Sequence, residues 1–354
     1  MLHLHIMKGF IKKLILLLLY TFSKKRQQDG LLVLCYHRVT DERDLHDPLK
    51  VSMTNFEKQI SFLKKNYHII SGEKLRDIIN ENEPMPNRSC MITFDDGWKD
   101  NYTHAYSILR KHDVPAVIFV STDYIGTNNI FWHERLQNYL LNCSENILNL
   151  GSIKNLEKWP IEIKDMISGI IKADIKDKQN KINELITALK KYKPDKINEL
   201  NNELSKIIIS GEIKEPLMLS WGQLKEMSQH NIHVGSHTRS HAILTQVSDK
   251  KVIEELKESK DILEKKLGRS IFYCSFPNGN YNESIMRVAK ETNYLASFAC
   301  LRGKIFSKDN RYEIKRIMIK EDISTGLDNE YSEIFFKIGL SGIKNYFKNI
   351  QIKK

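Results

Sequence analysis

The chain has 354 residues, 41% hydrophobic and 28% charged, a composition typical of a soluble globular protein with a large core in one α/β domain or two smaller ones. Lysine and arginine together exceed aspartate and glutamate by 11. Six basic residues lie in residues 1–28 and four in residues 339–354, and neither range contains an acidic residue. No basic platform with interleaved aromatic residues occurs, so we expect no nucleic-acid partner.

The first segment, residues 1–30, combines basic and apolar residues. An apolar run from Leu14 to Phe22 lies between two groups of lysines. It is about half the ~20 residues that a membrane-spanning helix needs, and no small-x-small cleavage site follows it. We therefore expect contact with a membrane surface through residues 8–26 and a location at the cell envelope, on either side of the membrane. An uncleaved export signal and a plain terminal helix are the alternatives.

Strand-like and helix-like stretches alternate over residues 31–320, with one interruption. This alternation predicts a parallel sheet with helical crossovers. Residues 131–215, rich in Lys, Asn, Glu, Ile and Leu, predict a helical insertion, and residues 321–354 a basic tail. Continuous apolar runs predict buried strands at 31–36, 90–94, 116–120, 232–235, 271–276, 295–301 and 314–319. Apolar spacing predicts helices at 54–66, 73–81, 100–112, from 221, at 249–266 and from 283.

Polar residues suited to chemistry follow four of the predicted strands. They are His37, Asp95 with Asp96, His237 with His241, and the loop Pro277–Tyr281. Because the carboxyl ends of parallel strands meet at one edge of a sheet, we expect these side chains to lie together. The spacing of His237 and His241 predicts one face of a helical turn. Two histidines and a carboxylate are a common ligand set for a hydrolytic metal, and an ordinary polar turn at Asp95–Gly97 is the alternative.

The sequence resembles the polysaccharide deacetylase family in several short motifs. The resemblance covers roughly residues 31–320, apart from the insertion, and includes the branch with an N-terminal Tyr-His motif. It implies a distorted (β/α) barrel, a divalent metal ion that is usually zinc, and hydrolysis of an N-acetyl group on a sugar. The motifs are Thr93–Gly97 and Ser236–His241, which resemble the two metal-site motifs, with Tyr36–Val39, Leu219–Trp221 and Phe276–Gly279.

The resemblance also implies roles for individual residues. Asp95 matches the general base, which takes a proton from water. Asp96, His237 and His241 match the metal ligands. The main-chain N–H of Asn278 matches the donor to the developing oxyanion.

Two features depart from the family's usual pattern. Many members take their catalytic acid from a Leu-x-His motif near the C-terminus, but no histidine follows His241 here. His37, which matches the Tyr-His motif, is the candidate acid, and the alternative is that it caps a strand end. Ser275-Phe276-Pro277 stands where the family commonly has Arg-Pro-Pro, so an arginine expected near the base is missing, and Arg316 is a candidate replacement.

We therefore expect a metal-dependent hydrolase that removes N-acetyl groups from a surface or envelope polysaccharide or from its lipid-linked precursor. An O-acetyl carbohydrate esterase and a catalytically inactive glycan-binding relative are the alternatives. Tyr281 and Trp221 are further candidates for contact with the glycan, although an aromatic ring such as that of Trp221 also serves in core packing. The five cysteines form no C-x-x-C pair, which argues against a cysteine zinc site, and those in strand-like runs, Cys35, Cys90, Cys274 and Cys300, are expected to pack as small hydrophobes.

Overall fold

The computed structural model of the chain describes residues 30–45, 47–142, 158–207, 217–301, 303, 309–326 and 328–341. The chain divides into two units, Met1–Gly126 with Leu219–Lys354, and Thr127–Met218. The second unit interrupts the first at the place in the sequence where the helical insertion over residues 131–215 is predicted.

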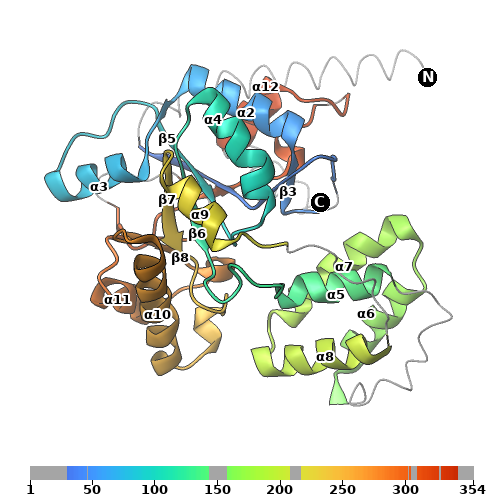
Figure 1. Cartoon of the computed structure of the whole chain (residues 1–354). Helices are drawn as coiled ribbons and strands as arrows, with labels where there is room; N and C mark the ends of the chain where they lie inside the picture. The colour runs from blue at the N-terminus through green and yellow to red at the C-terminus, as the bar shows by residue number, and fades with distance from the viewer. Residues whose placement is uncertain are drawn as a thin grey trace, which may run out of the picture. The chain divides into compact units, whose positions relative to one another are not determined.

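The apolar runs of the first unit form an eight-stranded parallel sheet in the order β10-β1-β5-β6-β7-β8-β9, with β4 beside β5. The strands β5, β6, β7 and β8 of this sheet are labelled in Figure 1. Leu34 of β1 lies opposite Ile92 of β5 on one side and Ile317 of β10 on the other. Phe298 of β9 bridges Ile314, just before β10, so the two ends of the sheet meet. The predicted α/β class and distorted (β/α) barrel are confirmed. The strands are β1 (Leu32–Tyr36), β4 (His68–Ile69), β5 (Ser89–Phe94), β6 (Ala116–Val120), β7 (Ile232–Ser236), β8 (Tyr273–Ser275), β9 (Ala296–Phe298) and β10 (Ile317–Met318), and a separate pair is β2 (Arg38–Thr40) with β3 (Lys50–Ser52).

Helices surround the strands in Figure 1 and follow the predicted apolar spacing. Serine side chains cap several of their N-termini, and Ser220 and Gln223 form a capping box at the helix that begins at Trp221. The predicted helix at 100–112 begins with a π-helical segment. The helical elements of this unit are α2 (Met53–Asn66), α3 (Gly72–Glu81), η1 (Asn101–Tyr106), α4 (Ser107–His112), α9 (Trp221–Ser228), η4 (Leu244–Gln246), α10 (Asp249–Leu267), η5 (Pro277–Gly279), α11 (Glu283–Glu291), η6 (Glu321–Ser324) and α12 (Glu333–Ser341).

The second unit is helical in its described part. Leu136, Ile167, Ile182, Leu185 and Leu204 are fully buried within it, so it has a hydrophobic core of its own. The apolar periodicity of its sequence therefore serves packing within the unit. Its helices are α5 (Trp132–Leu141), α6 (Ile161–Ile171), α7 (Ile175–Leu189) and α8 (Pro194–Ile207).

The predicted basic tail at 321–354 needs correction over its first part. Phe336 of α12 is fully buried and meets Phe62 of α2 edge to face, with ring centroids 5.4 Å apart. The carboxylate of Glu321 accepts hydrogen bonds from the backbone N–H of Ser52 and the amide of Asn55. These contacts make η6 and α12 part of the folded unit.

The predicted membrane-surface segment at 8–26 lies outside the described residues. Among the described helices, none is both long and apolar enough to cross a membrane.

Candidate active site

The interior face of the barrel changes from apolar to polar toward the carboxyl ends of its strands. Because successive side chains of a strand point to opposite faces, Val33 of β1 packs in the interior cluster and Cys35 continues the same face. On β5 the same alternation runs from Met91 through Thr93 to Asp95. The pleat of the sheet therefore turns these polar side chains toward the interior at the edge where ligands bind in barrels of this kind.

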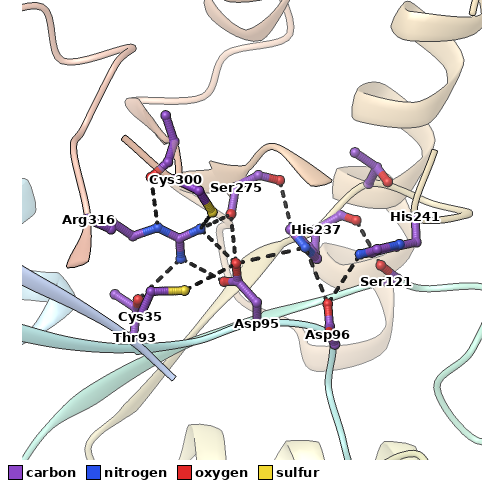
Figure 2. Close-up of polar contacts among 12 residues, drawn as sticks. Cys35, Thr93, Asp95, Asp96, Ser121, His237, His241, Ser275, Cys300 and Arg316 are labelled. Carbon is purple, nitrogen blue, oxygen red and sulfur yellow. Dashed lines mark hydrogen bonds and ion pairs between the residues drawn. The ribbon is translucent and has the colours of Figure 1, made fainter. Parts of the chain in front are cut away.

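Asp96, His237 and His241 converge beyond the ends of β5 and β7 (Figure 2). The Nε2 atoms of His237 and His241 lie 3.4 Å and 3.2 Å from Oδ1 of Asp96, and one possible ligand atom from each residue lies within 4.8 Å of the others. Nδ1 of His237 lies 2.8 Å from the carbonyl oxygen of Ser275, which only accepts, so this nitrogen carries the proton and leaves Nε2 as the ligand atom. Two imidazoles and one carboxylate fit a divalent metal ion.

The loop that carries the two histidines is not the helical turn that their spacing predicts. Thr238 and His241 have positive φ angles, 65° and 58°, so a helical path is broken twice within the motif. The imidazole rings nevertheless lie 5.0 Å apart between centroids. Ser240 anchors this loop to α10, because its N–H and its hydroxyl both donate hydrogen bonds to the buried carboxylate of Glu255. The predicted helical turn is therefore wrong, although the two imidazoles do lie side by side.

Asp96 is held in an unusual backbone conformation. Its φ is 78°, a region that non-glycine residues seldom adopt, and Gly97 follows with φ 88°. Burial opposes the charge of Asp96, but hydrogen bonds from His237 and His241 hold its pKa well below the usual range. Trp98, which the sequence did not single out, donates from Nε1 to Oδ2 of Asp96 at 3.0 Å. This bond leaves Oδ1 directed at the histidines.

Asp95 lies beside this cluster and makes different contacts. Nη1 and Nη2 of Arg316 bind its two oxygens at 2.7 Å each, and both side chains are fully buried. Nη2 of Arg316 also donates to the hydroxyl of Ser275 at 2.7 Å. Burial would raise the pKa of Asp95, but the charges of Arg316 and His237 lower it to about 2. The last strand thus places an arginine against the carboxylate where the usual Arg-Pro-Pro arginine is missing.

His37 follows β1 at the rim of the same site. Its side chain is buried, and Nδ1 has no hydrogen-bond partner among the described residues. Its main-chain carbonyl accepts a hydrogen bond from the amide of Asn101 at 2.7 Å, which fixes the backbone. The charge of His37 also contributes to lowering the pKa of both Asp95 and Asp96, so the three residues share one electrostatic environment.

The other predicted substrate contacts differ in position. Asn278 lies in η5, three residues after Ser275, and has a φ of 56°. Tyr281 stacks on Phe276, with ring centroids 5.7 Å apart, and burial and a hydrogen bond with Glu313 raise its pKa to about 12. These contacts give Tyr281 a packing role.

Trp221 is partly buried at the start of α9. It packs against the main hydrophobic core, and the ammonium group of Lys266 lies 5.4 Å from its ring. These contacts favour the core-packing alternative for this ring.

Two cysteines that were expected to pack as hydrophobes instead contact the polar site. Cys35 Sγ lies 3.6 Å from Oδ2 of Asp95, and Cys300 Sγ lies 3.6 Å from Nη2 of Arg316. Their isolated positions in the sequence carry no motif. The alternation of β1 could have placed Cys35 on the same face as the site, but nothing in the sequence pairs it with Cys300.

A family model described as polysaccharide deacetylase matches residues 82–297, more than half of the chain. The chain belongs to the polysaccharide deacetylase family. Members of this family are carbohydrate deacetylases, and the matched range includes Asp95, Asp96, His237 and His241.

Curated relatives resemble this deacetylase over most of its length. The putative polysaccharide deacetylase YxkH of Bacillus subtilis is 21% identical over 311 residues, covering 88% of this chain and 78% of the relative. A poly-β-1,6-N-acetyl-D-glucosamine N-deacetylase of Staphylococcus aureus is 23% identical over 312 residues, covering 84% and 81%.

Two solved structures support the fold of this deacetylase. The Streptococcus pyogenes deacetylase PplD, in complex with acetate, has a TM-score of 0.53 and 20% identity, and covers 84% of this chain and 95% of that one. IcaB from Ammonifex degensii has a TM-score of 0.54 and 18% identity, and covers 84% and 94%.

Proposed function

We propose that the protein is a metal-dependent N-deacetylase of an N-acetylated surface or envelope polysaccharide, or of its lipid-linked precursor. The observation that carries the proposal is the side-by-side arrangement of two different carboxylates. Asp96 faces two imidazoles, whereas Asp95 faces a guanidinium group and lies 3.9 Å from His237. A site for a cation and a separate proton acceptor next to it are what hydrolysis of an amide by water requires.

Asp96, His237 and His241 would hold the metal ion, for which we propose Zn²⁺ because imidazole and carboxylate ligands suit it. When bound, the ion supplies Lewis-acid polarisation of the acyl carbonyl and increases the acidity of water. Asp95 accepts the proton that the attacking water loses. Arg316 positions this carboxylate and keeps it ionised.

The remaining roles concern the oxyanion that develops on the acyl oxygen and the amine that leaves. The main-chain N–H of Asn278 donates to the developing oxyanion. His37 donates a proton to the departing amine, which is a poor leaving group without one. The burial of His37 and its electrostatic influence on both carboxylates support this role.

The name of the Staphylococcus aureus relative supports the substrate class, a polymer of N-acetylated amino sugar. We further propose that residues 8–26 bind a membrane surface at the cell envelope, where such polymers are made. Flotation with liposomes of the full chain and of a chain lacking residues 1–28 tests this point. Equal flotation of the two would contradict it.

Acetate release from N-acetylated and O-acetylated glycans tests the activity. We expect release from the N-acetylated glycan, loss of at least ~100-fold on chelation with recovery on adding Zn²⁺, and a similar loss in Asp95→Asn. Asp165→Asn, the same change at an exposed position of α6, is the matched control and should retain the wild-type rate. Activity that survives both chelation and Asp95→Asn would contradict the mechanism. Release from the O-acetylated glycan alone would identify an esterase.

A further inference from the structure

Two thiols flank the proposed base of this site. Cys35, at the buried end of β1, and Cys300, two residues beyond β9, approach Asp95 so that both sulfur atoms and one carboxylate oxygen lie within 4.8 Å of one another (Figure 2). The single S–H of Cys35 has two acceptors within this group, the carboxylate of Asp95 at 3.6 Å and the sulfur of Cys300, whereas Cys300 accepts a hydrogen bond from Arg316. The mechanism proposed above uses neither thiol.

Charge decides which chemistry this group suits. Two thiols and a carboxylate resemble a ligand set for a soft metal ion. However, the guanidinium of Arg316 already binds both oxygens of Asp95 at 2.7 Å and lies 3.6 Å from the sulfur of Cys300. A cation would have to displace this buried positive charge. The arrangement therefore disfavours a second metal site and favours chemistry of the thiols themselves.

We propose that Cys35 and Cys300 are a redox-active pair that a peroxide oxidises to a disulfide next to Asp95. The thiolate of Cys300 attacks one peroxide oxygen, which forms Cys300 sulfenic acid and releases hydroxide or alkoxide. The thiol of Cys35 then attacks this sulfenic sulfur, which forms the disulfide and releases water. Two thiols lose two electrons in total, and the peroxide gains them.

The different surroundings of the two sulfur atoms support this order of events. A hydrogen bond from Cys35 and the charge of Arg316 lower the pKa of Cys300 to about 6, although burial opposes the shift. Burial raises the pKa of Cys35 well above its usual value. At neutral pH Cys300 is thus the nucleophile and Cys35 the thiol that resolves its oxidised form. Cys300 is also the more exposed of the two, so peroxide reaches it first.

Disulfide formation would disturb the site, an effect that rests on the proposed function. The sulfur atoms must approach to about 2.05 Å, which removes the S–H of Cys35 from Asp95 and the thiolate from Arg316. Cys300 also packs against the turn that carries Asn278, since a Cβ atom placed on Gly279 would lie only 2.5 Å from the Cβ of Cys300. We therefore expect the oxidised protein to be less active.

Peptide mapping without reduction tests the pair directly. The full chain is treated with hydrogen peroxide at neutral pH and digested. We expect a Cys35–Cys300 linked peptide from the wild type and from Cys274→Ser, the matched control at a buried cysteine of β8, but not from Cys300→Ser. Loss of the linked peptide on adding a thiol reductant would support the pair further. No linked peptide in the wild type, or over-oxidation of Cys300 with Cys35 left as a free thiol, would overturn the proposal.

Acetate release from the same samples tests the coupling to catalysis. Peroxide should lower the rate at least fivefold in the wild type and in Cys274→Ser, with recovery on reduction, whereas Cys300→Ser should keep its own untreated rate. A linked peptide with an unchanged rate would overturn the coupling. A protein that releases no acetate even before treatment would contradict the proposed function, while the mapping would still decide the fate of the thiol pair.

Discussion

At the scale of single residues, the site depends on how one buried carboxylate keeps its charge. Asp95 is almost completely buried, and its charge persists because Arg316 binds both oxygens. The other N–H groups of the same guanidinium donate hydrogen bonds to the hydroxyls of Thr93 and Ser275 and to the carbonyl of Ala299. The arginine is therefore fully hydrogen-bonded within the barrel, as a buried charge must be.

Replacing Arg316 should move the pH profile of the reaction. In the wild type Asp95 has a pKa of about 2, so it is a proton acceptor at any higher pH and protonates only as the pH falls through that value. In Arg316→Met, burial acts without the guanidinium and raises this pKa, so we expect the acid limb of kcat/KM to move up by about 1–3 pH units. The limb is measured from pH 8 down to about pH 2, so that the range reaches the value for the wild type.

Arg76→Met, which removes a surface arginine paired with its neighbour Asp77, is the control and should leave the acid limb unchanged. Stability gives a second readout. Arg316→Met leaves a buried charge unpaired and should cost about 3–5 kcal/mol of unfolding free energy, whereas adding Asp95→Asn should recover part of it. An unshifted acid limb in a folded Arg316→Met variant would rule out the positioning role.

The proposed role of His37 as the acid is tested with two substrates that differ in their leaving group. An amide needs a proton on its departing nitrogen, whereas an activated aryl ester does not, so His37→Ala should slow amide cleavage by about 10²–10⁴-fold and ester cleavage far less. His68→Ala, at an exposed position of β4, should affect neither. Equal losses on both substrates would identify a structural role for His37. The measurement is the ratio of the two rates at one pH.

At the scale of elements, the sequence predicted the strands more fully than the loops that follow them. The apolar run at 90–94 predicted β5, and in the structure Thr93 and Asp95 at its carboxyl end both contact Arg316. The loop from His237 to His241 has no such apolar pattern, because its path depends on positive φ angles and on Glu255, a distant residue. Long-range contacts of this kind leave no local signal.

The same limit explains which site residues the sequence did not identify. The sulfur of Cys300 and the indole of Trp98 matter only because the barrel brings Arg316 and Asp96 against them. Neither residue belongs to a periodic pattern that indicates its partner. Arg316 was a candidate because the arginine of the usual Arg-Pro-Pro motif is missing from this sequence. How a residue so late in the chain reaches Asp95 becomes clear only from the structure, in which β10 pairs with β1.

A side chain at Gly97 should destabilise the turn after β5. Its φ is 88°, and an added Cβ atom would lie 2.9 Å from Ile125 and 3.0 Å from Val120. We expect Gly97→Ala to lower the unfolding free energy by about 1–3 kcal/mol, through backbone strain and these contacts. Gly222→Ala is the control, because position 222 lies in the first turn of α9 with space around it, and it should cause no loss. Denaturant unfolding of both variants measures the difference, and equal stabilities would contradict the strain argument.

At the scale of the whole molecule, the hydrophobic core clusters of the barrel unit and of the helical unit share no residue among those that the structure describes. The core of the barrel's outer face includes Ile92 and Phe94, and the core of the helical unit includes Ile182 and Leu185, all nearly or fully buried. One unit can therefore unfold without exposing any side chain of the other unit's core. Apolar periodicity alone predicted the helices of residues 131–215, because each helix needs only one buried stripe.

Separate cores predict that calorimetric unfolding is not a single two-state transition. Leu185→Ala removes a fully buried side chain of the helical unit, so we expect it to cost about 2–5 kcal/mol in that unit's transition and to leave the barrel's transition in place. Ile92→Ala, the matched change in β5, should lower the barrel's transition instead. Zn²⁺ should raise only the transition that Ile92→Ala lowers, because all the proposed ligands belong to the barrel. A single transition that both substitutions lower equally would mean that the two units unfold together.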